Sequence, residues 1–152
     1  MKRDFKIIEI DPASETAHLL IGELHADLET KYGKGSIENF HNENDSMLVF
    51  LVAVDSFNNP LACGALKHFS KGTAEIKRMF VLPEQRGKGL SKNILNELEQ
   101  TAIKLGYKRV VLETGHKQPE AISLYRTNGY SQLKCFDKFS DDPDSICFQK
   151  TF

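Results

Sequence analysis

The sequence contains no tryptophan and only three cysteines in 152 residues. Cys63, Cys135 and Cys147 are odd in number and widely spaced, so they form neither a CxxC metal pair nor the framework of a disulfide-stapled domain. We expect three reduced thiols, mostly buried, which is typical of a cytoplasmic protein. This composition predicts no metal site.

Long apolar runs and a surplus of one charge are also missing. No stretch reaches the roughly 18 apolar residues that a transmembrane helix needs, and residues 1–10 lack the apolar core of a secretory signal. We therefore expect no membrane partner. The formal net charge of −1 argues against a dedicated nucleic-acid-binding protein, because such proteins carry a clear basic surplus. With 40% apolar and 27% charged residues, the chain is predicted to form one globular domain, residues 1–152.

Hydrophobic periodicity divides the chain into alternating strand and helix patterns. Strands are predicted at residues 5–10, 47–54, 61–69, 73–82, 109–113, 130–136 and 145–150. Helices are predicted at residues 14–29, 37–41, 92–105 and 120–128. The three strands in the middle should form an antiparallel meander, whereas the helical crossover before residues 109–113 predicts a parallel neighbour. The fold class is therefore α/β with a mixed sheet.

A glycine-rich junction separates the strand that ends at Leu82 from the following helix. It reads Arg86-Gly87-Lys88-Gly89. Free amides at a helix start, together with the helix dipole, attract anions, and glycines let the backbone approach closely. The P-loop pattern GxxxxGK[ST] is absent, and the dinucleotide pattern GxGxxG fails because Lys92 occupies its third glycine.

Two segments carry a resemblance to a known family. VLPEQRGKGLSKNILNELE resembles motif A of the GNAT superfamily of acetyl-CoA-dependent N-acetyltransferases, in which V-x-P is followed by R-G-x-G-[IL] and a helix. QPEAISLYRTNGY resembles the family's motif B, A-x-x-L-Y-x-x-x-G-[FY]. Glu84 stands where the older pattern has Gln or Arg, and Ser91 where glycine is common. The resemblance implies a three-layer α+β domain with a mixed, mostly antiparallel central sheet of about seven strands, flanked by about four helices.

The same resemblance implies a binding site for acetyl-CoA. The loop from Gln85 to Ser91 would hold the pyrophosphate through its amides, and the strand before it would pair with the pantetheine arm. The implied cofactor-binding residues are Met79, Phe80, Val81, Gln85, Arg86, Gly87, Lys88, Gly89, Leu90, Ser91, Ala121 and Tyr125.

Transfer to an amine requires a base, an acid and donors for the oxyanion. The resemblance implies that Tyr125 is the acid that protonates the departing thiolate. The base is Glu75 or Glu113, and the sequence leaves both open. His116 could lie at the rim, and an acyl-enzyme on Cys63 is the minor alternative because nothing nearby indicates an activated thiol.

The predicted function is transfer of the acetyl group of acetyl-CoA to a primary amine of a small molecule, protein or peptide, by direct attack in a ternary complex. The alternative is a non-catalytic regulatory module that binds coenzyme A or acyl-CoA. We expect the acceptor site to draw on residues 24–36, the loop before Pro60, residues 113–120 and residues 136–145. Acidic residues in these segments suit a cationic amine. Edge strands of the sheet would allow a homodimer.

Overall fold

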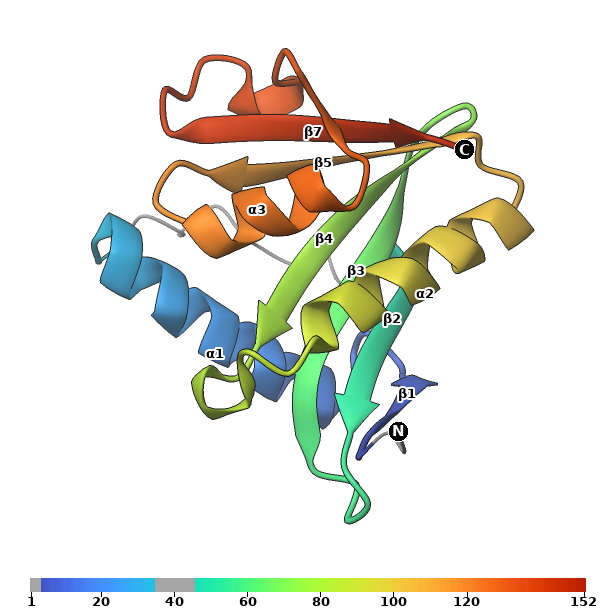
Figure 1. The fold of residues 1–152 in the computed structure, drawn as a ribbon, viewed down its shortest axis with the longest axis vertical. Coiled ribbons are helices and arrows are strands. Elements are labelled where there is room, and N and C mark those ends of the chain that lie inside the picture. Colours follow the sequence, from blue (N-terminus) through green and yellow to red (C-terminus); the bar gives the residue numbers. More distant parts are fainter. Residues whose placement is uncertain (1–3, 35–45) are drawn as a thin grey trace.

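The computed structural model describes residues 4–34 and 46–152 (Figure 1). The strands are β1 (Lys6–Glu9), β2 (Met47–Val54), β3 (Pro60–Ser70), β4 (Thr73–Val81), β5 (Arg109–Gly115), β6 (Ser131–Leu133) and β7 (Ser145–Thr151). The helices are α1 (Glu15–Tyr32), α2 (Leu90–Lys104) and α3 (Pro119–Thr127), with short 3-10 turns at Pro83–Gln85 and Asp137–Phe139. The seven predicted strands are confirmed. The helix predicted at residues 37–41 lies outside the described residues.

The strands form one sheet in the order β1-β2-β3-β4-β5-β7-β6, and every neighbouring pair is antiparallel except β4 and β5. Helices α2 and α3 pack on one face and α1 on the other (Figure 1). Alternate strand residues supply the two cores, because successive side chains of a strand point to opposite faces. Among residues 4–34 and 46–152, no helix has the length and apolar character needed to cross a bilayer.

The central parallel pair separates after a short contact. The β4–β5 register covers only Thr73 to Glu75 on β4 and Arg109 to Val111 on β5. Beyond it, β4 stays with β3 and β5 stays with β7, so the two strands diverge toward their carboxyl ends (Figure 1). The sheet therefore opens at its centre, with α1 on one side of the opening and α2 and α3 on the other.

A bulge in β4 accompanies this opening. Cys63 pairs with Phe80 and Ala65 with Lys77, so Arg78 and Met79 both lie opposite Gly64. Arg78 has φ 59°, a conformation that costs energy for any residue with a side chain. Gly64 faces α2 so closely that a Cβ there would lie 2.6 Å from Ile94. The glycine lets α2 rest directly on the sheet beside the bulge.

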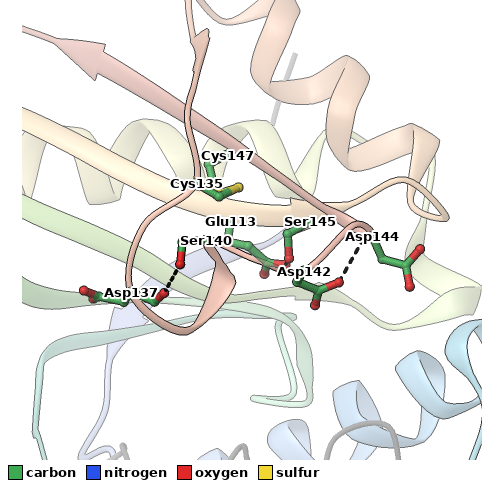
Figure 2. The surroundings of a disulfide bond; sticks show 8 residues. All are labelled: Glu113, Cys135, Asp137, Ser140, Asp142, Asp144, Ser145 and Cys147. Atoms are coloured by element: carbon green, nitrogen blue, oxygen red, sulfur yellow. Dashed lines mark hydrogen bonds between the residues drawn. A yellow bond between two sulfur atoms is a disulfide. The ribbon is translucent and has the colours of Figure 1, made fainter.

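The prediction of three reduced thiols is wrong for two of them. Cys135 and Cys147 form a disulfide, with Cα atoms 5.1 Å apart (Figure 2). The β6–β7 pairing explains the proximity, because Leu133, two residues before Cys135, lies opposite Cys147. Cys63 stays a buried free thiol. The cytoplasmic expectation rested partly on reduced cysteines, and the disulfide removes that support.

Candidate active site

A cavity of about 560 Å³ occupies the opening between β4 and β5. Every element around the opening contributes to its wall: α1, the carboxyl ends of β4 and β5, the glycine-rich loop, the first turn of α2, and α3. Phe139, from the loop between β6 and β7, closes one edge. The turn before Pro60, which we expected to contribute, does not line the cavity because it joins β2 and β3 at a distant corner of the sheet (Figure 1).

The glycine-rich loop presents backbone amides to this cavity. Gly87 and Gly89 have φ 81° and 79°, values that glycine adopts without steric cost. Gly89 is the N-cap of α2 and offers no side chain to its first amides. The first intrahelical bond of the cap runs from the Asn93 amide to the Gly89 carbonyl, so the amides of Leu90 to Lys92 have no partner within the helix. This arrangement suits a phosphate group.

The two cations of the loop have different surroundings. Arg86 turns toward the cavity, where its Nε donates to the Val81 carbonyl at 3.0 Å and its guanidinium lies 3.4 Å from the Asp27 carboxylate. Lys88 points outward and donates to the Gln85 side chain at 3.0 Å. Of the residues implied to bind the cofactor, Lys88 alone does not line the cavity, and Glu75, Glu113 and Tyr125 all line it.

Helix α1 connects the two sides of the opening, which the sequence motifs did not indicate. Asp27 contacts Lys31 at 3.0 Å as well as Arg86, and so ties α1 to the glycine-rich loop. Five residues further along, the Tyr32 hydroxyl accepts bonds from the Lys117 amide and the Gln118 side chain at 3.2 and 3.4 Å. Gly115 leaves room for it, since a Cβ there would overlap the Tyr32 hydroxyl. Helix α1 thus spans the cavity.

The two candidate bases, Glu75 and Glu113, lie on the α1 face of the sheet. Glu75 is buried and forms an ion pair with Lys77 at 3.8 Å. Glu113 accepts a hydrogen bond from the Ser145 hydroxyl at 2.8 Å. Burial raises the pKa of Glu113 to about 7, partly offset by the Ser145 bond. A carboxyl that titrates near neutral pH can take up and release a proton under ordinary conditions.

Tyr125 lies on the opposite side of the opening, on α3. It is only 4% exposed and packs against Tyr130, with ring centroids 5.5 Å apart. Burial, and then the charge of Glu113, raise the pKa of the Tyr125 hydroxyl well above its usual range. The phenol therefore keeps its proton at neutral pH, as a proton donor must.

Two other side chains that the sequence raised as catalytic alternatives are poorly suited to the task. Cys63 is 1% exposed, and burial raises the pKa of its thiol to about 12, so it stays protonated and weakly nucleophilic. His116 is exposed and does not line the cavity.

Comparison with known proteins bears on this site. Residues 13–130 match the model of the acetyltransferase (GNAT) family. The chain belongs to the GNAT family. An IAA acetyltransferase of Azospirillum brasilense is 36% identical over 102 residues, which cover 66% of this chain and 66% of that protein. The uncharacterized N-acetyltransferase YsnE of Bacillus subtilis is 34% identical over 90 residues, 58% of this chain and 60% of the relative. The matches thus span less than two thirds of these relatives' length.

Solved structures share the fold of this chain. A GNAT family acetyltransferase of Elizabethkingia anophelis with acetyl-CoA bound superposes with a TM-score of 0.75 over 99% of this chain and 100% of that one, at 18% identity. The PaiA N-acetyltransferase of Thermoplasma acidophilum, in complex with coenzyme A, gives a TM-score of 0.71 over 99% and 100% of the two chains, at 19% identity. At these identities the likeness concerns the fold, which confirms the predicted mixed sheet.

Proposed function

We propose that this GNAT chain is an N-acetyltransferase that moves the acetyl group of acetyl-CoA to a primary amine in a ternary complex. One observation supports this most strongly. The opening between β4 and β5 has an anion-binding loop and a protonated tyrosine on one side and two carboxylates on the other. Two substrates entering from opposite faces would meet between them.

The donor side fits coenzyme A in charge and in shape. The amides at the start of α2 would receive the pyrophosphate, with Gly87 and Gly89 permitting its close approach. The β4–β5 register ends at Glu75 and Val111, and the two strands diverge beyond it (Figure 1). An amide-bearing arm such as pantetheine could lie along β4 in this opening as an added strand. Arg86 is held toward the cavity by Asp27 and Val81 and adds positive charge there.

In this proposal the protein supplies groups for each proton transfer. A carboxylate on the α1 face, Glu75 or Glu113, takes the proton of the acceptor ammonium. The neutral amine attacks the thioester carbonyl, the C–N bond forms and the C–S bond breaks. The Tyr125 hydroxyl protonates the departing thiolate. Acetyl-CoA supplies the activated acyl group, and no metal is needed for these steps.

The acceptor side favours a cation. Glu75 and Glu113 line it directly, and Asp142 lies close enough to Glu113 to raise the pKa of that carboxyl. Lys77 balances one of these charges through its ion pair with Glu75. Other cations line the cavity as well, so the two glutamates, and not a net negative charge, would attract an ammonium group. Small amines, polyamines and a lysine or N-terminus of a peptide all carry this group.

A thiol-release assay with acetyl-CoA and a panel of primary amines, amino acids, polyamines and a lysine peptide tests the proposal. We expect release that depends on one class of amine. Tyr125→Phe should lower turnover on that amine by about 10²-fold or more while acetyl-CoA affinity is kept, because only the proton donor is lost. Acetyl-CoA binding without turnover on any acceptor would instead favour a regulatory module, and unchanged turnover in Tyr125→Phe would refute the acid assignment.

A further inference from the structure

Glu75 and Glu113 share one face of the sheet but differ in their partners. Glu75 has the Lys77 ammonium 3.8 Å away, and both side chains are less than a tenth exposed. An acceptor ammonium that approached Glu75 would therefore meet a cation already paired with it. Glu113 receives an uncharged donor, the Ser145 hydroxyl, at 2.8 Å. The Glu113 carboxyl has a pKa of about 7, so it can exchange a proton at neutral pH.

The Ser145–Glu113 contact follows from the register of β5 and β7. Ser145 lies directly opposite Gly115, and Glu113 lies opposite Cys147. Side chains at positions 113 and 115 point to the same face, so Ser145 and Glu113 are diagonal neighbours, and the long glutamate side chain spans the gap. Cys147 lies two residues after Ser145 on β7 and is bonded to Cys135 (Figure 2). The disulfide therefore fixes this end of β7.

Other charged groups around Glu113 come from three elements. Burial raises the pKa of Glu113 most, and the Ser145 hydrogen bond lowers it. The charges of Asp142, in the loop, and Glu75, on β4, raise this pKa further, whereas the Lys77 charge on β4 lowers it. Tyr125 on α3 faces the same carboxyl across the opening, since the Glu113 charge raises the pKa of the tyrosine. Glu113 therefore stands between the acceptor side and the proposed proton donor.

We infer that Glu113 is the group that accepts the proton of the acceptor ammonium, and that Ser145 is the positioning residue that holds the Glu113 carboxylate in its reactive orientation. This inference rests on the proposed function. One ammonium proton passes to Glu113, which later releases it to solvent. The thiolate takes the Tyr125 proton, and the nitrogen of the tetrahedral intermediate returns a proton to the tyrosinate. Products are the amide, free thiol and one proton, so the charges balance.

The pH dependence of kcat/KM for the amine, at saturating acetyl-CoA, tests the inference. The wild-type profile should fall on its acid side as Glu113 becomes protonated. Ser145→Ala should move this acid limb to higher pH, because the lost hydroxyl bond no longer favours the carboxylate. Ser145→Thr, which keeps a hydroxyl, should restore the limb. A purely structural role for Ser145 would lower activity without moving the profile.

Variants of the two glutamates separate the alternatives. Glu113→Gln should abolish the limb that Glu113 sets and leave only the pH dependence of the amine's own protonation. It should also lower turnover by about 10²- to 10⁴-fold, the usual range for loss of a general base. Glu75→Gln should keep a limb and move it to lower pH, opposite to Ser145→Ala, because the Glu75 charge raises the Glu113 pKa.

The inference is overturned if Glu75→Gln abolishes the limb, if Glu113→Gln keeps it, or if Ser145→Ala leaves it in place. Those results would leave the proposed function standing, provided that the wild type still releases thiol with the amine. A wild type that releases none at any pH would refute the proposed function itself. The carbon-13 resonance of the Glu113 carboxyl gives a second readout without any acceptor. Its titration should move to higher pH in Ser145→Ala and return in Ser145→Thr, and an unmoved titration counts against the inference.

Discussion

The placement of Glu113 should destabilise the folded protein as the pH rises from acid to neutral. Its pKa is raised from 4.5 to about 7, mainly by burial, so between these pH values the folded chain binds more protons than the unfolded chain. Stability should therefore fall as pH rises from about 4.5 to about 7. A shift of this size corresponds to roughly 3 kcal/mol, at about 1.4 kcal/mol per pH unit.

Glu113→Gln removes this cost because a glutamine does not ionise. Relative to wild type, the variant should gain about 3 kcal/mol in its free energy of unfolding between pH 4.5 and pH 8. The substitution also alters the contact with Ser145, but an effect of that contact on stability that does not depend on pH is the same at pH 4.5 and pH 8 and cancels in the difference. The gain would come at the expense of activity, as expected for a strained functional site.

Urea unfolding at pH 4.5 and pH 8 measures this difference. The chain has no tryptophan, so far-ultraviolet circular dichroism is the suitable signal. Glu97→Gln, on the exposed side of α2, is the matched control for loss of one carboxylate. If Glu113→Gln changes stability by the same amount at both pH values, Glu113 does not have a raised pKa and the reasoning fails.

Two further predictions concern a buried ion pair and the disulfide. Lys150→Met should lower the free energy of unfolding by about 1–3 kcal/mol, because the Lys150 ammonium bonds buried Glu99 at 2.9 Å. Urea unfolding measures this loss, with the exposed Lys104→Met as the control. Equal losses in the two variants would refute the prediction. Reduction of Cys135–Cys147 by a dithiol should lower stability by about 3 kcal/mol, as expected for a loop of this length. Reduction should also raise the KM for the amine more than the KM for acetyl-CoA, since the freed loop carries Phe139 and Ser145. Cys135→Ser should have the same effects without a reductant. An increase confined to the KM for acetyl-CoA would contradict this prediction.

Most of the fold was predictable because its signals are local. The strand predicted at residues 47–54 coincides with β2, and the glycine-rich junction precedes α2 as predicted. The parallel β4–β5 pair followed from the helical crossover between the strands. Such patterns depend on residues close together in the chain, where periodicity and turn chemistry are informative.

Features of the site that depend on register were not predictable. The Ser145–Glu113 bond joins residues 32 positions apart, and it exists only because β5 and β7 pair in one particular register. The Asp27–Arg86 contact likewise depends on how α1 crosses the opening. Arg78 gives no sequence signal for its positive φ, since the bulge appears only in the register between β3 and β4. The disulfide was missed because spacing alone does not reveal which cysteines a hairpin brings together.

Calorimetric titration with acetyl-CoA tests the central claim most directly, namely that the glycine-rich loop holds this donor. Wild type should show saturable binding, and Gly89→Glu should lose it, because the new side chain blocks the amides and repels phosphate. Gly72→Glu is the matched control, since Gly72 has a similar φ of 77° but lies in the β3–β4 turn, outside the cavity. It should bind as wild type does. No binding to wild type, or equal binding to Gly89→Glu and wild type, would contradict the assignment of this loop.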